Sequence, residues 1–405
     1  MHRRQHTLKV LIGAALAGTA LTAHASGFRL PEASLAGLGT SNALVANAQE
    51  PGALAYNPAA MAFHDGTTVV AGLIAIAPDM SVTTSTGSHD SDVDSPFYVP
   101  NLFATGHISP TVTWGLGIGA PFGLETNWAS GTFPALSPPS PAAAAHPTRS
   151  KIDMVNINPN LAVKLGANTS VAAGLDYYYV RDVRLDSAGA KIAGDGGDYG
   201  FNLAVLHKAG NWSFGGSYRS AITVDVDGTA TTVITAPATA NVDFPWMLQV
   251  GARYQATKAV AVEFDIERTG WSEFDQIRIT SAALPGGQIT STNNWDDANA
   301  YRLGATWDVS PQTQLRAGYT FDETGQTDEY FGARLPDADR HLFSVGIAQK
   351  LGGWTVEGGY MYVLFDDRDY FSTLPPSADP NGTSAYNGSY SANVHLLGLG
   401  VSTKF

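Results

Sequence analysis

Arginine side chains on the polar faces of alternating segments are the groups in this chain best suited to bind an anion. Arg302 and Arg316 lie on such faces, and Arg184 lies near the end of another alternating segment. A guanidinium group can hold a carboxylate through two parallel hydrogen bonds. The same segments also carry acidic residues, so internal ion pairs are the simpler role for these arginines. We keep Arg184, Arg302 and Arg316 as candidate residues for binding a carboxylate ligand.

Patterns typical of catalytic or metal sites are missing from the sequence. There is no Gly-x-Ser-x-Gly nucleophile motif and no His-Glu-x-x-His motif, and the chain has no cysteine. Asp90, Asp92 and Asp94 could offer oxygen ligands to calcium, but the run lacks the glycine and the terminal glutamate of an EF-hand loop. A solvated loop is the simpler interpretation. We therefore predict no catalytic residue, no cofactor and no metal site.

The composition departs from that of a soluble globular protein. Only 15% of the 405 residues are charged, compared with about 25% in soluble domains. The formal net charge is -13, and residues 1–25 hold three basic and no acidic residues, so the rest of the chain is near -16. Such a charge disfavours nucleic acid and anionic lipid as partners.

The first 25 residues have the pattern of a secretory signal peptide. Basic residues precede the apolar stretch Val10–Leu21, and Ala23-His24-Ala25 gives a small-x-small cleavage site. A transmembrane anchor is the alternative, but a spanning helix needs about 20 apolar residues. We expect cleavage after Ala25 and a mature chain that begins at Ser26.

From about residue 67 onward, apolar and polar residues alternate with the period of a β-strand. In the segment 301–309, for example, Leu303 and Trp307 alternate with Arg302 and Thr306. We predict strands over residues 67–78, 97–108, 111–123, 152–165, 170–186, 197–208, 212–227, 243–255, 259–279, 298–309, 313–322, 339–350, 354–370 and 386–405. Their number is even, as single-chain outer-membrane barrels require.

The connections between these segments alternate between short and long. Tight turns such as 109–110 and 351–353 are followed by long polar stretches such as 79–96, 124–151 and 371–385. Short periplasmic turns and long external loops are typical of outer-membrane barrels, and only a closed barrel satisfies every strand edge in lipid. The last predicted strand ends at Phe405, which suits an interfacial aromatic girdle. We predict an all-β fold, a transmembrane antiparallel β-barrel of about fourteen strands in the outer membrane of a double-membraned bacterium.

Residues 26–66 do not alternate and are rich in small residues and turn signals. A barrel of this size has a lumen wider than the side chains of its wall can fill, and many large barrels carry a plug. We predict three parts: a signal peptide at 1–25, an N-terminal plug, or hatch, at 26–66, and the barrel at 67–405. A flexible periplasmic lead is the alternative for the second part. A general aqueous porin is disfavoured because it needs an open lumen.

Several short motifs resemble, in order, those of the FadL family of outer-membrane transporters for long-chain fatty acids and other hydrophobic molecules. The motifs include Ser26-Gly27-Phe28, Tyr56-Asn57-Pro58-Ala59, Phe244-Pro245, Thr269-Gly270-Trp271-Ser272-Glu273-Phe274 and Leu335-Pro336-Asp337-Ala338-Asp339-Arg340. The resemblance extends from Ser26 to Phe405. It implies a monomeric fourteen-stranded barrel whose hatch includes Gly27, Phe28, Asn57, Pro58 and Ala59.

The resemblance also implies a function. Cargo enters from outside, binds in an apolar pocket beside the hatch, and leaves sideways through a gap in the wall that an inward kink of the third strand creates. Passive uptake of long-chain fatty acids or similar hydrophobic molecules is therefore expected. Uptake of aromatic hydrocarbons is an alternative within the family, and an outer-membrane enzyme of the lipase or protease type is the alternative from another class. Besides the cargo, outer-membrane lipid and lipopolysaccharide are the expected partners.

The third predicted strand contains a residue that favours such a gap. Pro121 has no N–H group for a strand ladder and is flanked by Gly119 and Gly123. We predict a lateral opening at these three residues, although Pro121 could instead lie beyond the membrane. One departure from the family is the short loop 187–196, which puts an external capture groove in doubt. The proline-rich stretch 124–151 could serve for capture, but a stiff shield is the simpler interpretation.

Overall fold

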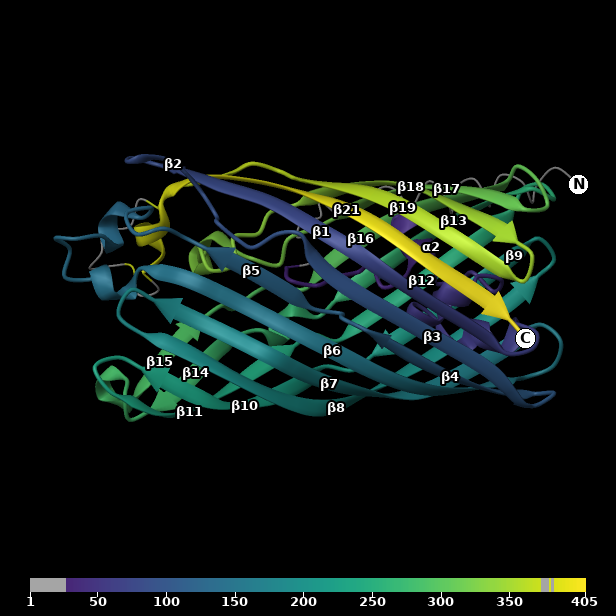
Figure 1. Ribbon diagram of the computed structural model, residues 1–405, viewed down its shortest axis with the longest axis horizontal. Helices are drawn as coiled ribbons and strands as arrows, with labels where there is room; N and C mark the ends of the chain where they lie inside the picture. The colour runs from purple at the N-terminus through teal and green to yellow at the C-terminus, as the bar shows by residue number, and fades with distance from the viewer. Residues whose placement is uncertain (1–26, 373–378, 380–381) are drawn as a thin grey trace, which may run out of the picture.

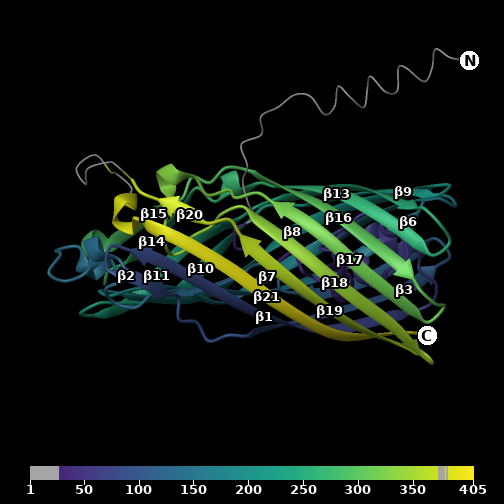
Figure 2. The same ribbon diagram turned by 90° about the horizontal axis from the view of Figure 1, so that it is seen from above.

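The computed structural model describes residues 27–372, 379 and 382–405, which form one closed antiparallel β-barrel (Figures 1 and 2). The ring closes because β1 (Thr68–Thr84) pairs with β3 (Phe97–Ser109) on one side and with β21 (Gly388–Lys404) on the other. The barrel has 14 strands around its circumference, which confirms the predicted barrel class and strand number. The predicted signal peptide and the predicted first mature residue, Ser26, lie outside the described residues.

Several strands of the wall are interrupted, so the sheet consists of 21 segments. The other segments are β2 (Gly87–Asp90), β4 (Val112–Gly119), β5 (Gly123–Asn127), β6 (Pro147–Lys164), β7 (Thr169–Ser187), β8 (Lys191–Ala209), β9 (Trp212–Arg219), β10 (Ile222–Thr231), β11 (Thr235–Phe244), β12 (Met247–Gln255), β13 (Val260–Thr269), β14 (Gln276–Ser281), β15 (Gln288–Thr292), β16 (Ala298–Asp308), β17 (Thr313–Asp322), β18 (Arg340–Leu351), β19 (Trp354–Phe365) and β20 (Arg368–Tyr370).

The predicted strands overlap these segments, but several stretches left between them also form strand at the loop end, among them 228–242, where β10 and β11 form a hairpin. The stretch 79–96 was predicted as a loop, but β1 continues to Thr84 and forms a hairpin with β2. The predicted loop 187–196 is also shorter, because β8 already begins at Lys191. Both strands extend beyond the predicted boundary because polar residues continue the ladder on a wall that faces water, where apolar alternation is not required.

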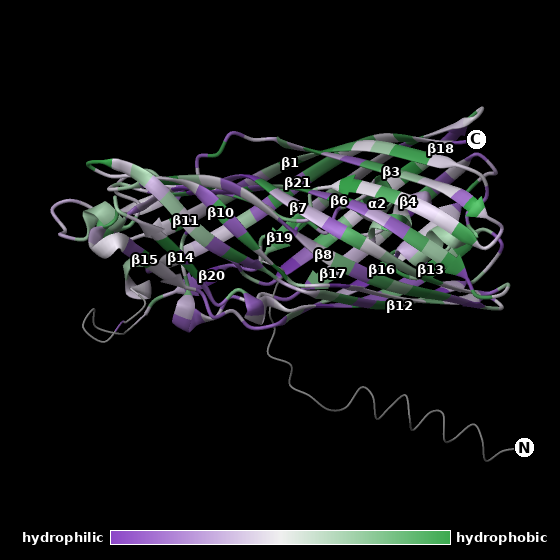
Figure 3. Cartoon of the chain, turned by 90° about the horizontal axis from the view of Figure 1, so that it is seen from below, coloured by the Kyte–Doolittle hydropathy of each residue, from purple (hydrophilic) through white to green (hydrophobic). Residues whose placement is uncertain are grey.

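The wall has two zones of opposite polarity. Toward the short turns, Leu203 and Phe264 face outward while Asp176 and Glu263 are buried inside. Toward the long loops the pattern is reversed: β10 turns Asp225 and other polar residues outward and buries its valines inside. Figure 3 shows hydrophobic residues gathered on the half of the barrel near the C-terminus. The first zone matches lipid, and the second matches a polar exterior around an apolar lumen.

The segment that precedes β1 lies within the ring of strands. It contains α2 (Leu35–Gly39), η1 (Pro51–Ala55) and η2 (Pro58–Phe63), most of whose residues are buried. α2 contacts β17, β18, β19 and β21, whereas η2 contacts β4, β6, β7 and β8 on another part of the wall. No helix in the described part of the chain is long and apolar enough to cross a membrane.

Candidate functional site

The third strand of the wall breaks between β4 and β5. β4 pairs with β6 up to Gly119↔Asn156, and β5 resumes the pairing at Gly123↔Asp153. Across the break the third strand therefore advances by one residue more than β6 does. The ladder between β3 and β4 ends at Leu102↔Ile118. Pro121 lies within the break, where its missing N–H costs no ladder bond. The break lies at the residues for which a lateral opening is predicted, and the opening itself stays a prediction.

The N-terminal segment supplies the pairing partner that β3 does not. The Leu30 amide donates to the Pro121 carbonyl at 2.9 Å, and the Gly123 amide donates to the Phe28 carbonyl at 3.0 Å. Arg29 and Phe122 form the corresponding isolated β-bridge. The third strand therefore turns toward the lumen at the break, and Phe122 is only 1% exposed.

A cluster of six aromatic rings fills the lumen beside this bridge. The ring centroid of Phe28 lies 4.8 Å from that of Trp271, 5.3 Å from Phe274 and 6.0 Å from Phe244. Phe122 and Trp295 complete the cluster. Aromatic pairs at such distances and with tilted planes stabilise one another by about 0.5–1.5 kcal/mol beyond burial. The buried indole Nε1 of Trp271 has no hydrogen-bond partner among the described residues.

An outer loop holds the start of the N-terminal segment. The Gly27 amide donates to Asp337 Oδ2 at 3.1 Å, and the Thr324 hydroxyl donates to the same oxygen at 2.7 Å. Burial raises the pKa of the Asp337 carboxyl above its usual value. Gly27 has a φ of +57°, and a Cβ there would lie 2.4 Å from the Trp295 ring, so only glycine fits.

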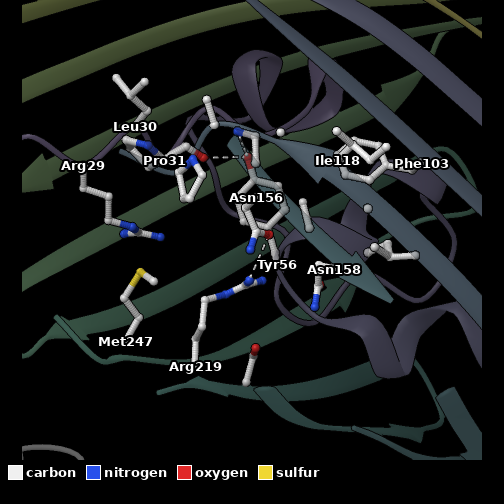
Figure 4. A pocket seen from close by; sticks show the side chains of 18 of the residues that line it. Arg29, Leu30, Pro31, Tyr56, Phe103, Ile118, Asn156, Asn158, Arg219 and Met247 are labelled. Atoms are coloured by element: carbon white, nitrogen blue, oxygen red, sulfur yellow. Dashed lines mark hydrogen bonds between the residues drawn. The ribbon is translucent and has the colours of Figure 1, made fainter. Parts of the chain in front are cut away.

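A cavity of about 80 Å³ lies between the N-terminal segment and the break in the wall (Figure 4). Its lining includes the apolar side chains of Leu30, Leu54, Phe103, Ile118 and Met247 and the polar side chains of Arg29, Asn156, Asn158, Arg219 and Gln249. Gly119 and Pro121 at the break also line the cavity. The cavity is thus amphipathic and borders the interrupted strand.

Ion pairs organise the polar side of this cavity. Arg302 holds Glu267 through two hydrogen bonds of 3.2 and 2.9 Å, and Arg29 contacts the same carboxylate. Two guanidinium groups therefore share one carboxylate. Arg219, which also lines the cavity, is paired with the buried Asp176. Removing one partner of such a buried pair typically costs about 3–5 kcal/mol.

The three arginines predicted as ligand-binding residues lie in ion pairs, and none of them lines the cavity. Arg302 pairs with Glu267. Arg316 pairs with Glu357 on the wall and, at 2.9 Å, with Glu50 of the N-terminal segment. Arg184 pairs with Asp182 near the loop end, where both side chains are partly exposed. Each of the three arginines thus has an acidic partner, and a role in binding a ligand stays a prediction.

The predicted hatch residues Asn57, Pro58 and Ala59 attach the segment to the wall. The Asn57 side chain accepts from the Ala59 amide at 3.0 Å, which caps η2, and Pro58 occupies the first helical position. Asn57 Nδ2 donates to the carbonyl of Val205 on β8 at 3.0 Å. The Ala59 carbonyl accepts from the Ser170 hydroxyl on β7 at 2.7 Å.

The rest of the segment fits against the wall at backbone distance. A Cβ on Gly215 would lie 1.9 Å from the Val45 carbonyl oxygen, and one on Gly318 would lie 2.2 Å from the Thr40 carbonyl carbon. Val45 also donates its amide to Asp265 on β13 at 3.0 Å. These contacts come from several strands, so the segment has little freedom to shift as a whole.

The proline-rich loop packs against other outer loops. Trp128 Nε1 donates to the Ala333 carbonyl at 2.7 Å, and Phe133 contacts Tyr386 edge to face. Trp128 and Phe133 are both buried in a small apolar cluster with Phe331. The loop thus has the packed character expected of a shield.

Several residues of the cavity escaped the sequence analysis. Arg29, Arg219 and Met247 were not considered, because segments far apart in the chain bring them together. A signal for the aromatic cluster was present, since Phe28 and Trp271 occur in the family-like motifs. The motifs carry no information, however, about which residues meet.

A family model, a relative of known function and two solved structures all resemble this chain. The family model described as outer membrane protein transport protein (OMPP1/FadL/TodX) matches residues 16–405. The long-chain fatty acid transport protein of Escherichia coli O6:H1 is 24% identical over 400 residues, covering 84% of this chain and 86% of that protein. A crystal structure of a Pseudomonas aeruginosa FadL homologue is 16% identical with a TM-score of 0.78, covering 94% and 100%. The Ralstonia pickettii toluene transporter TbuX is 15% identical with a TM-score of 0.69, covering 92% and 99%.

Proposed function

The chain belongs to the OMPP1/FadL/TodX family of outer membrane transport proteins, and from this premise we propose that it takes up long-chain fatty acids or similar hydrophobic molecules. The family consists of transport channels, so the enzyme alternative is not retained. The observation that carries the proposal is the amphipathic cavity between the N-terminal segment and the broken third strand.

The lumen near the loop end suits an apolar cargo. Val224 and Val226 of β10 and Ile279 of β14 are buried in one apolar cluster that extends to Phe28 and its aromatic neighbours. Transfer of apolar surface from water into such a lumen is favourable by about 25 cal/mol per Å². A hydrophobic molecule that passes the outer loops would therefore move toward the cavity without a polar barrier.

We propose that the N-terminal segment acts as a hatch and that the cargo leaves sideways. The close contacts at Gly215 and Gly318 and the bonds of Asn57 keep the segment in place. The break around Pro121 offers a route that does not require the whole segment to leave. Movement of residues 27–30 away from the Phe122 bridge would then suffice to open this route.

The cavity favours a cargo with a polar end. Arg29, Asn156 and Asn158 can donate hydrogen bonds to a carboxylate, while Leu30 and Met247 contact its hydrocarbon part. The second candidate is an aromatic hydrocarbon, which the six-ring cluster around Phe28 favours. Uptake of a fatty acid and of toluene by the same cells would distinguish the two.

Two further parts of the proposal concern partners. We propose that the barrel is a monomer, because the wall closes on itself through the pairing of β1 with β21, and the third strand bonds to the N-terminal segment at its break. Outer-membrane lipid contacts the apolar outer zone, and lipopolysaccharide surrounds the polar one.

The exit route is tested by filling the break. Gly119 has no heavy atom within 4 Å of an ideal Cβ position, so Gly119→Phe should fold and occupy the opening. Gly353 in a short turn is equally free, which makes Gly353→Phe a matched control. We expect uptake of a fluorescent fatty acid to fall at least about tenfold for the first variant only, since 1.4 kcal/mol of added barrier has that effect. Equal uptake by both variants would refute lateral exit at this position.

A further inference from the structure

Charged side chains follow the apolar band on the outer face of β6 and β7, which lie side by side in the wall (Figure 1). Every second residue from Val155 to Val163 on β6, and from Val171 to Tyr179 on β7, faces outward and is apolar or aromatic. Toward the long loops, the next outward residues are Asp153 on β6 and Arg181 on β7. Tyrosine prefers the boundary between lipid tails and headgroups. The charged residues beyond Tyr179 therefore lie at the level of the headgroups of the outer leaflet.

A β-bulge turns one extra charged residue outward at this level. The pairing of β7 with β8 shifts register between Val180 and Val183, and both valines are buried inside the barrel. The two residues between them, Arg181 and Asp182, therefore both lie on the outer face, where their side chains are 54% and 26% exposed. Bulges of this kind commonly re-aim a side chain.

Three cations on this surface share two carboxylates. Lys151 and Arg184 are cross-strand partners, and both bond Asp182, at 3.2 and 2.8 Å. Arg181 bonds Asp153 at 2.6 Å. Like charges directly opposite each other on neighbouring strands destabilise a sheet, so Lys151 and Arg184 favour anionic groups between them. In the described part of the chain Arg184 bonds Asp182 through Nε alone, and its two terminal nitrogens can donate to a further anion.

The charged groups around these three cations have other partners. Arg149 pairs with Glu125 at 2.7 Å. Asp195 accepts a hydrogen bond from the Tyr179 hydroxyl at 3.1 Å, and Asp186 accepts one from a backbone amide of β8 at 3.0 Å. The chain as a whole carries a formal net charge of -13. Salt screens exposed charges beyond about 8 Å, however, so the nearest groups decide what this surface attracts.

We propose that Lys151, Arg181 and Arg184 bind a phosphate group of lipopolysaccharide at the surface of the outer leaflet. An arginine holds a phosphate through two parallel hydrogen bonds, and a lysine holds it as a point charge. A phosphate placed among the three cations takes up the positive charge that the two carboxylates leave over. The inference rests on the proposal above that lipopolysaccharide surrounds the polar zone, and it names the surface that binds it.

Lipid binding measures this contact without any cargo, so the outcome leaves the uptake proposal untouched. The full-length protein is purified in a neutral detergent and titrated with lipid A that carries both phosphates, or with lipid A of the same acyl chains from which the phosphates have been removed. Bound lipid is counted by native mass spectrometry. Lys151→Gln/Arg184→Gln should bind the phosphorylated form at least about tenfold more weakly, equivalent to about 1.4 kcal/mol. Lys151→Arg/Arg184→Lys should retain binding, and heat-modifiable migration checks that each variant is folded.

A matched control separates this surface from diffuse charge. Arg268 and Arg278 are exposed on the outer faces of β13 and β14, and Arg268→Gln/Arg278→Gln should bind phosphorylated lipid A as the wild type does. An equal loss in both double variants would overturn the proposal, because the attraction would then belong to the outer zone as a whole. No preference of the wild type for the phosphorylated form would overturn it as well.

A second variant distinguishes lipid binding from a purely structural ion pair. Asp182→Asn removes the carboxylate that competes with a phosphate for Lys151 and Arg184. Binding of phosphorylated lipid A should therefore become tighter in this variant. Unchanged or weaker binding would contradict the proposal, because the two cations would then serve Asp182 and no lipid.

Discussion

The Asn57 side chain donates a hydrogen bond to the Val205 carbonyl on β8, with a distance of 3.0 Å between nitrogen and oxygen. The same nitrogen donates to the Val45 carbonyl at 2.7 Å, within the N-terminal segment. One amide group thus joins two parts of the segment to each other and to the wall. The pairing of the strands does not depend on this amide group. The attachment of the N-terminal segment to the wall can therefore be weakened while the barrel still folds.

Substitution of Asn57 should weaken the attachment of the N-terminal segment without preventing the barrel from folding. Asn57→Ala removes the cap of η2 and both donated bonds, a loss of about 2–3 kcal/mol at the usual values. Asn57→Asp keeps the cap but places a buried carboxylate against the Val45 and Val205 carbonyl oxygens, which costs more than the loss of the two donated bonds. We expect both variants to migrate as folded barrels and to lose uptake, with the aspartate variant affected more. Full uptake by Asn57→Asp would show that the bond to Val205 has no part in transport.

Deletion of residues 26–60 tests whether the segment blocks the lumen. The contacts of α2 and η2 lie on different parts of the wall, so their removal should leave a wide opening. Ion conductance in planar bilayers should rise well above that of the intact protein. An unchanged conductance from a folded deletion barrel would show that the segment is not a plug.

A bulky side chain at Gly318 should displace the segment without deletion. A Cβ there would lie 2.2 Å from the Thr40 backbone, so Gly318→Val forces the two apart at a cost of about 1–3 kcal/mol. Gly353→Val has free space and serves as the control. We expect higher background conductance for Gly318→Val alone. Equal conductance of the two variants would mean that the close fit does not seal the lumen.

The outer loop at Asp339 should respond to pH. Burial, and next the neighbouring Asp366 and Asp337, raise the pKa of the Asp339 carboxyl to about 7. The folded state therefore binds a proton more tightly than the unfolded state does, and stability rises as the pH falls through 7. Hydrogen exchange at residues 323–340, corrected for intrinsic rates, should show more protection at pH 6 than at pH 8. Asp339→Asn should abolish the difference, and a difference that persists in this variant would assign it to another group.

The strands of the barrel wall could be predicted because the pattern that specifies each strand lies within a short stretch of the sequence. Alternation with period two locates strands in lipid, and the missing N–H of Pro121 identifies the break without reference to any partner. The cavity could not be predicted in the same way. Arg29 and Glu267 are far apart in the chain, and their contact depends on how the N-terminal segment lies within the ring.

The polarity switch along the wall was also beyond the sequence analysis. Alternation in β10 looks like that of any membrane strand, but its apolar residues face the lumen and its aspartates face outward. Only the closed ring shows which face is inside. The extensions of β1 and β8 at the loop end were missed for another reason, because polar strands outside the membrane lack the apolar alternation expected in lipid.

The central claim is that cargo passes while α2 and η2 stay in contact with the wall and only residues 27–30 of the N-terminal segment move. A disulfide can fix the segment, because an ideal Cβ on Gly359 of β19 lies 3.6 Å from the Leu38 Cβ of α2, within the range for disulfides. The chain has no other cysteine, so Leu38→Cys/Gly359→Cys allows one bond only. Fatty-acid uptake by this variant should be the same in the oxidised and the reduced state. Uptake that is lost on oxidation and restored by reduction would contradict the account, because the segment would then have to leave its seat for transport.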